Sequence, residues 1–341
     1  MAEIVLAILL GPVLWLAGAI VFDGVHWVLH CMLRSDSAWL RGLARPHGVH
    51  HEWIDRNLET HWELQSANVW CHIIPEYLTQ LAFTGLVALV LPLPYAVVLA
   101  ALQTGVFLGM LYFRGRDVNH RPAARIDAHP PGWLTPPRYH ALHHVWPDAY
   151  FSAYTKVVDR IVGGGSQIAE RRFGWVGPDS ALASALRAKL EHLGGVVVPG
   201  PTDMSAVDVL VLLDPAAPLD APVEAFIQAT CERQLPPEVW ALRANGEDPL
   251  ARHYLTDVRV TFRTLLVPGE VPAAPAAQRA ARRALFWIRR DAHFVALGSF
   301  VGLSALRRFR HTEPVEPEDS QVVRNRLELD AVRAADARSA P

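Results

Sequence analysis

The sequence predicts a mainly α-helical protein, in which an amino-terminal membrane domain is followed by a small α/β domain. Three observations support this fold class. Apolar stretches near the amino terminus are long enough to cross a bilayer, histidine clusters lie between and after them, and the composition changes to Ala, Arg and Pro with short aliphatic runs after Gly165. The chain has 341 residues, enough for about two domains. Its formal net charge of -2 gives no reason to expect nucleic acid as a partner.

The first apolar stretch runs from Ile4 to Phe22 and carries no charge. A helix needs about 20 apolar residues to cross the bilayer core, so this stretch is long enough. A secretory signal peptide would begin with basic residues and have a shorter apolar core, whereas this chain begins Met1-Ala2-Glu3. We therefore expect a transmembrane helix that continues through His26 and His30.

The second apolar region extends from Ile74 to Phe113 and is interrupted at Pro92-Leu93-Pro94. Proline ends a helix, so the region divides into two spans joined by a tight, uncharged turn. Together with the first span, this hairpin gives about three transmembrane helices. Between the first span and the hairpin, five tryptophans suit the membrane interface, where an amphipathic ring keeps one edge in water. They are Trp27, Trp39, Trp53, Trp62 and Trp70.

One crossing followed by a hairpin places residues 23–73 and the chain from 114 onward on the same side of the membrane. Basic residues near the span ends mark the cytoplasmic side. In this chain they are Arg34, Arg41, Arg45, Arg56, Arg114, Arg116, Arg121 and Arg125. The amino terminus and the hairpin tip contain no Lys or Arg. We therefore expect an integral protein of a bacterial inner membrane, with its histidine clusters and its second domain in the cytoplasm.

Histidines recur at helical spacing in three places. The segment at 47–51 has imidazoles at positions i, i+3 and i+4, the segment at 140–144 repeats this spacing, and His26 and His30 lie at i and i+4. These offsets place the rings of each segment on one face of a helix. A lone histidine is more often a core or surface residue than a ligand, but a repeated HxxHH word favours metal binding.

The number of histidines indicates two metal ions and an oxidative function. A single zinc or iron takes two to four protein ligands, so eight imidazoles suit a pair of ions. A zinc hydrolase is the competing interpretation, but it needs only two or three histidines with a carboxylate base, and the sequence contains no HExxH word. Nitrogen-rich sites without thiolates suit redox-active iron as well as zinc, and two adjacent irons could together supply the electrons that activate O₂ for attack on a C–H bond. Together with the membrane helices, this favours oxidation of a lipid.

Five segments carry a resemblance to a known family: HWVLH at 26–30, HGVHH at 47–51, NH at 119–120, TPPRYHALHH at 135–144 and YFSAYTKVVDRIVGG at 150–164. In order and spacing, residues 1 to about 165 resemble the fatty acid hydroxylase superfamily, also called the sterol desaturase family, of membrane-bound non-haem di-iron oxygenases. The resemblance implies metal ligation by His26, His30, His47, His50, His51, His120, His140, His143 and His144. Asp159 and Gly163 match the segment that closes the domain in this family, and a helix that ends at glycines explains them equally well.

The resemblance implies two iron ions, with zinc as a substitute on purification, and O₂ as cosubstrate. The expected reaction is hydroxylation or desaturation of a fatty acid, a sterol or a related lipid during lipid biosynthesis. The sequence shows no haem, flavin or iron–sulfur site, so a ferredoxin-like or cytochrome b5-like partner must supply electrons. Two alternatives remain open: aldehyde deformylation in hydrocarbon synthesis, and a non-catalytic membrane scaffold stabilised by its metals.

Other histidines and the cysteines give weaker indications. His61, His72 and His129 are each either part of the metal site or interfacial residues, and His72 with Glu76 would suit orientation of the ligand imidazoles. The cysteines, Cys31, Cys71 and Cys231, are odd in number and widely separated, which argues against disulfides or a CxxC metal site.

The second part of the chain predicts alternating strands and helices, which is typical of an α/β domain with a parallel sheet. Short aliphatic runs at 195–198, 207–213, 238–242 and 258–267 predict strands. Helical patterns lie at 182–193, 223–235 and 276–291. We place the two domains at 1–165 and 172–312, followed by a charged, poorly ordered tail at 313–341.

The second domain resembles a reduced, Rossmann-like short-chain dehydrogenase, a domain that bacterial proteins sometimes fuse to the hydroxylase fold. The segment in the place of the glycine-rich phosphate loop reads VGPDSALA at 176–183 and contains a single glycine. Without further glycines the backbone cannot approach a pyrophosphate closely. A Tyr-x-x-x-Lys pair is also missing, because Val258 stands four residues after Tyr254. The domain is therefore predicted to keep the fold for packing, docking or regulation and to bind no dinucleotide.

Overall fold

The protein was analysed as a computed structural model, which describes residues 1–116, 119–120, 126, 128, 133–136, 138–198, 204–213, 220–230, 233–243, 259–266 and 274–291. The chain divides into two compact units. Unit 1 comprises Met1–Ile126 and Trp133–Gly164, and unit 2 comprises Asp127–Gly132 and Gly165–Pro341. Three features of the sequence analysis, His129, Tyr254 and the tail at 313–341, lie outside the described residues.

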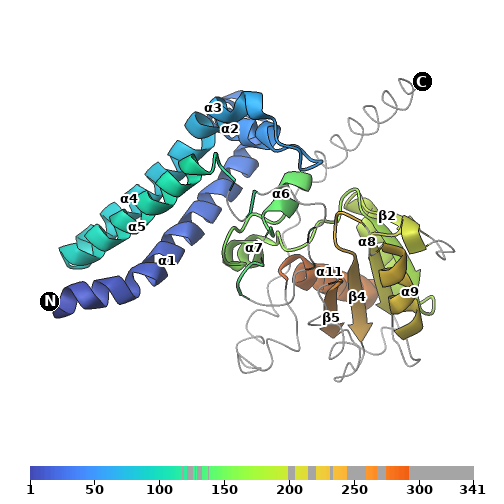
Figure 1. Cartoon of the computed structure of the whole chain (residues 1–341). Coiled ribbons are helices and arrows are strands. Elements are labelled where there is room, and N and C mark those ends of the chain that lie inside the picture. The colour runs from blue at the N-terminus through green and yellow to red at the C-terminus, as the bar shows by residue number, and fades with distance from the viewer. Residues whose placement is uncertain are drawn as a thin grey trace. The chain divides into compact units, whose positions relative to one another are not determined.

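Three long helices form the apolar part of unit 1. They are α1 (Ala2–Leu33), α4 (Ile74–Val90) and α5 (Leu93–Tyr112), which pack side by side (Figure 1). The segments Ala2–Leu33, Trp62–Val90 and Leu93–Tyr112 are each long and apolar enough to cross a membrane. The prediction of three such helices is confirmed, and α1 continues through His26 and His30 as expected. The turn between α4 and α5 falls at Leu91 and Pro92, where the proline pattern placed it.

The three helices bury few large apolar side chains between them and expose many. Ala7, Val87, Tyr95 and Leu99 form the small shared core. Leu89 is 81% exposed, and many other apolar side chains on these helices are also exposed, by smaller fractions. Monomeric soluble proteins rarely leave such extensive apolar surface in contact with water, so the outer faces of these helices are suited to lipid.

Shorter helices of unit 1 carry most of the histidines. Helix α2 (Ala38–Trp53) begins at Ser37, whose hydroxyl accepts a hydrogen bond from the Leu40 backbone N–H. The 3-10 turn η1 (Trp62–Leu64), α3 (Gln65–Asn68) and the π-helical turn η2 (Val69–Ile73) lead into α4. After the hairpin follow α6 (Ala141–Val145) and α7 (Val157–Val162).

The tryptophans near the histidine segments do not all lie at an interface. Trp39 and Trp70 are each 69% exposed, in agreement with an interfacial position. Trp53 is fully buried, so its expected interfacial position is wrong. Gly115, at φ +77°, packs against the Trp53 ring so closely that an added Cβ would lie 2.8 Å from it. This glycine closes the loop after α5 over the end of α2.

Unit 2 contains a five-stranded parallel sheet in the order β2-β1-β3-β4-β5. The strands are β1 (Arg172–Val176), β2 (Val196–Val198), β3 (Val209–Leu213), β4 (Glu238–Arg243) and β5 (Thr261–Leu266). The helices are α8 (Ala181–His192), α9 (Asp220–Thr230) and α11 (Ala274–Arg289), with the short 3-10 turn η3 at Met204–Ala206. The predicted α/β domain with a parallel sheet is therefore present.

Helices cover both faces of this sheet, because its strands are apolar on both sides. The odd residues of β3, such as Val209 and Val211, pack with α8 and α11. The even residues, Leu210 and Leu212, pack with Phe226 of α9 and its neighbours. A strand that is buried on both faces reads as an unbroken aliphatic run, which explains why β3 could be predicted from sequence.

Strand β1 was missed by the sequence analysis, because its sequence RFGWV contains a charge and a glycine and is only five residues long. Its inclusion gives the strand order 2-1-3-4-5 among the described residues, which is the order of flavodoxin-like doubly wound sheets. The dinucleotide-binding order is 3-2-1-4-5-6. If strand 3 of that fold is absent and the remaining strands are renumbered, the order is also 2-1-3-4-5. The strand order is therefore compatible with the proposed reduced dehydrogenase fold and with other doubly wound folds.

The loop 177–180 lies between β1 and the amino terminus of α8, where a dinucleotide-binding fold places its phosphate loop. Gly177 has φ +130°, and an added Cβ would lie 2.5 Å from the Leu213 carbonyl oxygen. The Ser180 hydroxyl accepts a hydrogen bond from the Ala183 backbone N–H, and Asp179 forms an ion pair with Arg187. The helix terminus is therefore capped by its own chain, and an acidic side chain lies beside it.

We expect NAD and NADP to fail to bind at millimolar concentration in calorimetry of the full-length protein. Pro178 removes one N–H donor from the loop, and Asp179 places a negative charge where the phosphates would lie. Unfavourable interaction of like charges there is on the order of 1 to 4 kcal/mol, or about tenfold to a thousandfold in affinity. A micromolar affinity for either nucleotide would contradict the prediction.

Candidate metal centre

Three elements of unit 1 bring the histidines together. The last two turns of α1 carry His26 and His30, one face of α2 carries the histidines at 47, 50 and 51, and α6 carries His143 and His144. Helix α6 is only five residues long and begins after His140, which has helical backbone angles and precedes its first turn. The expected helix through 140–144 is therefore shorter than the pattern suggested, but the three rings still face the same region.

The nine histidines of the sequence prediction fall into two adjacent groups. In each group, one ring nitrogen from every member lies within 4.8 Å of those of the others. The first group consists of His26, His30, His47, His51 and His143, and the second of His50, His120, His140 and His144. The groups are in contact, since the ring centroids of His51 and His144 are 4.9 Å apart. Eight of the nine side chains are buried, and His51 is partly buried.

The spacing within the first group fits a metal ion better than a hydrogen-bond network. His30 Nε2 lies 2.9 Å from the Nε2 of His47, 3.1 Å from that of His51 and 3.0 Å from that of His143. A neutral imidazole has one donor and one acceptor nitrogen, so one Nε2 cannot satisfy three such neighbours. Metal–imidazole bonds of about 2.0–2.1 Å at right angles hold neighbouring nitrogens about 3 Å apart. The observed separations match this value.

Several rings direct one nitrogen to a protein oxygen and leave the other for a ligand. Nδ1 of His50 lies 3.0 Å from Asn68 Oδ1, and Nδ1 of His144 lies 3.0 Å from the Ile54 carbonyl oxygen. Nδ1 of His143 lies 2.7 Å from the Ala149 carbonyl oxygen. An Nδ1–H that donates to these oxygens leaves a lone pair on Nε2, and such partners orient the ligand histidines of metal sites. Nε2 of both His50 and His144 is buried without a hydrogen-bond partner.

The electrostatics of the groups also suit metal binding. Burial lowers the pKa of His47 to about 4, and burial also lowers the pKa values of His50, His51, His143 and His144. At neutral pH these imidazoles are therefore uncharged, which is the form that binds a metal. Their mutual repulsion when protonated acts in the same direction. The donor set, its spacing and its charge state all fit a pair of metal ions.

A buried loop within the segment 150–164, which the sequence analysis assigned to the closing of the domain, supports the first group. The Phe151 ring lies 5.1 Å from that of His143 and 5.6 Å from that of His30, centroid to centroid. Asp159 accepts hydrogen bonds from the backbone N–H groups of Phe151 and Ser152 and from the Tyr139 hydroxyl. Burial raises the pKa of Asp159 to about 6, while these hydrogen bonds lower it. Asp159 therefore fixes the loop that covers the histidines.

Gly163 and Asp23 complete the support of this loop. Gly163 has left-handed backbone angles and ends α7, as the alternative interpretation of the glycines proposed. The next residue, Gly164, approaches Asp159 so closely that an added Cβ would lie 2.5 Å from its Oδ1. Asp23, one turn before His26, accepts a hydrogen bond from the Ala153 backbone N–H. The contact between Asp23 and Ala153 could not be predicted from the sequence, because the two residues are 130 positions apart.

The π-helical turn at Val69–Ile73 contributes two further neighbours of the second group. Asn68 precedes this turn and accepts from His50, as described above, while the His72 ring stacks on the His50 ring at a centroid distance of 3.6 Å. His72 Nε2 lies 3.8 Å from Glu76 Oε2. The wider π turn directs both residues toward His50, and such turns are frequent at functional sites. Asn68 was missed because the sequence gives no signal for a π turn.

The less certain histidines of the sequence analysis differ in position. Among the described residues, His61 and His72 belong to neither group. His72 is buried against the second group, which suits the orienting role considered for it. His61 is exposed and forms ion pairs with Asp55 and Glu63.

Comparison with known families supports the resemblance. The model of the fatty acid hydroxylase family matches residues 15–164. The matched residues include all nine histidines of the two groups, together with Asp23, Asn68 and Asp159. No curated protein and no solved structure matches the chain. The match ends at the boundary between the two units, and it leaves unit 2 without a family assignment.

Proposed function

We propose that the chain is a membrane-bound, O₂-dependent oxidoreductase that hydroxylates or desaturates a lipid and holds two iron ions in its two histidine groups. The observation that supports this proposal most directly is the pair of adjacent, buried imidazole groups beside three apolar helices. The family match over residues 15–164 supports the same class of reaction. A zinc hydrolase is less consistent with the site, because nine imidazoles exceed what hydrolytic zinc needs.

The protein's own residues would bind, orient and shield the metals. His26, His30, His47, His51 and His143 would hold one ion, and His50, His120, His140 and His144 the other. Paired iron ions supply the redox chemistry that activates O₂ for attack on an unactivated C–H bond. The Ala149 and Ile54 carbonyl groups fix the ring orientation of His143 and His144. Phe151 covers the first group with an apolar ring, which limits the access of water.

The position of the centre along the chain suits a lipid substrate. His26 and His30 lie on the same continuous helix as the apolar anchor, and α4 begins directly after His72. The histidines are therefore held at one end of the three apolar helices, where a lipid tail enters from the bilayer. We further propose that this end faces the cytoplasm, where a ferredoxin-like or cytochrome b5-like protein delivers electrons.

We expect a reporter fused after Gly165 to be cytoplasmic and a reporter inserted at Leu93 to lie across the membrane. The reason is that the arginines cluster at the histidine end of the helices, whereas the hairpin tip has none. Paired alkaline phosphatase and green fluorescent protein fusions measure both positions in cells. Both reporters on the same side would contradict the proposed topology.

The reaction itself is tested by product analysis. Purified protein, loaded with Fe(II) and supplied with a reductant and O₂, should consume O₂ in the presence of a membrane lipid extract and yield a hydroxylated or an unsaturated lipid. An aldehyde-deformylating enzyme would instead release a hydrocarbon shortened by one carbon. A metal-loaded protein that consumes no O₂ with any lipid fraction would be the scaffold of the sequence analysis, and the proposal would fail.

A further inference from the structure

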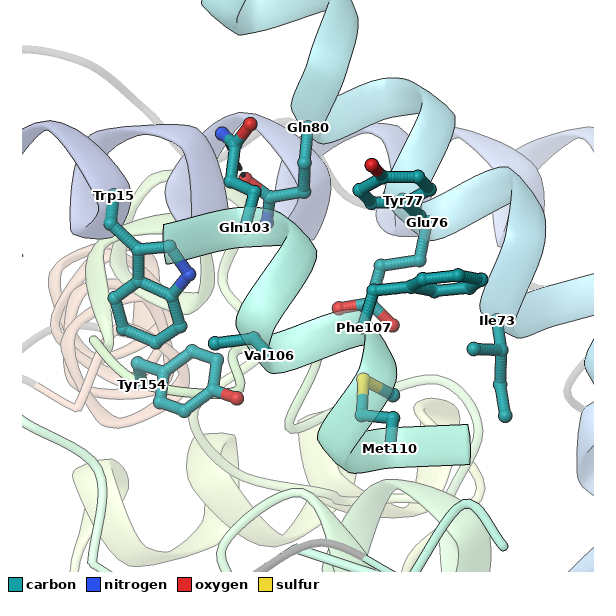
Figure 2. Close-up of a pocket in the computed structure, with 10 residues that line it drawn as sticks. All are labelled: Trp15, Ile73, Glu76, Tyr77, Gln80, Gln103, Val106, Phe107, Met110 and Tyr154. Atoms are coloured by element: carbon teal, nitrogen blue, oxygen red, sulfur yellow. Dashed lines mark hydrogen bonds between the residues drawn. The ribbon is translucent and has the colours of Figure 1, made fainter. Parts of the chain in front are cut away.

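A cavity inside the membrane-spanning part of unit 1 has polar walls, although lipid-facing helices surround it. It is partly open, and its enclosed part has room for only a small polar group. Figure 2 shows that its walls come from α1, α4, α5 and Tyr154 of the buried loop. The lining residues used below are Trp15, Glu76, Gln80, Gln103, Val106 and Tyr154.

Two glutamines and a threonine form a hydrogen-bonded chain at this cavity. Thr84 Oγ1 donates to Gln103 Oε1 at 2.5 Å, and Gln103 Nε2 donates to Gln80 Oε1 at 3.4 Å. All three side chains are more than nine-tenths buried. Helix α1 contributes Gly18 at this point, where an added Cβ would lie 2.6 Å from Gln80 Oε1. The glycine thus gives the two amides room between the three helices.

The chain of hydrogen bonds ends at the cavity with a donor. The amide nitrogen of Gln80 donates to no acceptor among the described residues, although its side chain is only 7% exposed and lines the cavity. An N–H that faces a cavity without an acceptor is costly in a bilayer, which offers no water to accept its hydrogen bond. Polar side chains at such a depth mark sites of function more often than sites of packing. An acceptor oxygen from a ligand would satisfy this donor.

We propose that this cavity binds the hydroxyl group of a neutral lipid. The hydroxyl oxygen accepts from the Gln80 amide, and its proton is donated to an oxygen of Tyr154 or of Glu76, which lies one turn before Gln80 on α4. A fatty acid suits the cavity less well, because its carboxyl group would lie beside the Glu76 carboxyl group, and two carboxylates that share one site repel each other. Trp15 and Val106 provide the apolar wall for the adjoining chain.

The depth of the cavity indicates which part of the lipid reaches the histidines. Gln80 follows His72 by eight positions, which is roughly 12 Å along a helix. A lipid held by its hydroxyl at Gln80 therefore presents a carbon further along its chain to the metal centre, and not the carbon that bears the hydroxyl. This assignment of the lipid as substrate rests on the proposed function, whereas the binding does not.

Photolabelling of the full-length protein in nanodiscs tests the binding without any turnover. The probes are hexadecanol and hexadecanoic acid that carry a diazirine on the same carbon near the polar end. We expect the alcohol to label peptides that contain Trp15, Val106 or Tyr154 about tenfold more strongly than the acid does. We expect Gln80→Leu to reduce this labelling about tenfold, and Thr79→Leu, a partly exposed neighbour on the same helix that does not line the cavity, to leave it unchanged.

A second variant keeps the test decisive if Gln80→Leu fails to fold. Val106→Trp fills the cavity from α5 without removing a hydrogen bond, and it should reduce labelling by the alcohol to the same extent. Equal labelling by acid and alcohol, or labelling that survives both substitutions, would overturn the proposal. Labelling as expected in a protein that oxidises no lipid would leave the binding site intact and refute the oxidase function instead. Lipid oxidation without labelling of the cavity would support the oxidase function and refute the binding site.

Discussion

Replacement of His50 or His143 by Ala should abolish lipid oxidation and reduce the bound metal from close to two ions per chain. Each residue provides one imidazole to a different group, and each has its outer nitrogen held by a protein oxygen. Loss of either ligand should directly weaken the binding of one ion and should also disturb the binding of the other, because the rings of the two groups are in contact. Loss of an orienting partner alone costs 10- to 100-fold in affinity or activity, so loss of a ligand should cost more. Elemental analysis and O₂ consumption measure the two effects.

His61→Ala is the matched control, because His61 is exposed and belongs to neither group. It should retain both the metal and the activity of the unmodified protein. Asn68→Ala provides a graded comparison. It removes only the acceptor of the His50 ring, so it should reduce metal affinity less than His50→Ala does. Full occupancy by zinc alone with retained activity, or an active protein that lacks both His50 and His143, would contradict the prediction of an iron site.

Arg263→Ala should destabilise unit 2 by about 3 to 5 kcal/mol, because it removes a buried cation that pairs with two buried carboxylates. The Arg263 guanidinium is fully buried and forms ion pairs with Glu238 and Asp291, and it also donates to the Gly165 carbonyl oxygen at 2.8 Å. Glu238 in turn pairs with Arg171 at 2.5 Å. This buried network joins β4 and β5 to the start of unit 2 and to the end of α11. Hydrogen exchange of the β4 and β5 amides in the full-length protein measures the loss of stability.

Arg259→Ala is the corresponding control, since Arg259 forms an ion pair with Glu224 near the protein surface at 3.6 Å. Exposed pairs contribute about 0 to 1 kcal/mol, so its hydrogen exchange should change little. Arg263→Met offers a further comparison, because an apolar side chain of similar length does not replace the cation that pairs with Glu238 and Asp291 and should not restore stability. Equal effects of Arg259→Ala and Arg263→Ala would show that the buried network contributes little.

The membrane helices and the histidine set could be predicted because each depends on a local pattern. An uncharged run such as Ile4–Phe22 identifies a span by length alone, and the spacing of the histidines at 47, 50 and 51 identifies one helix face. In the second domain, β3 could be predicted from its unbroken aliphatic run, whereas β1 has no such run. These patterns are independent of any distant contact.

The residues that escaped prediction act through contacts that are distant in sequence or through irregular backbone. Asp23 meets Ala153 across 130 positions. Asp159 was named from the resemblance, but the hydrogen bonds it accepts depend on a loop conformation that no periodic pattern encodes. Asn68, whose side-chain oxygen lies 3.0 Å from His50 Nδ1, directly precedes a π turn, for which the sequence gives no signal. The division of the nine histidines into groups of five and four also depends on the packing of α1, α2 and α6 against one another, which their spacing in the sequence does not specify.

Because α1 combines the membrane anchor and two histidines of the first group in one uninterrupted helix, the depth of the metal centre depends on bilayer thickness. A hydrocarbon core of about 30 Å accommodates about 20 residues of an upright helix, so His26 lies just beyond a core that begins near Ile4. In a thinner bilayer a helix tilts to keep its apolar length covered, and it carries His26 and His30 with it. Hydrophobic matching would then determine how deeply a lipid chain must rise to meet the histidines, and lipid composition would influence which carbon is oxidised.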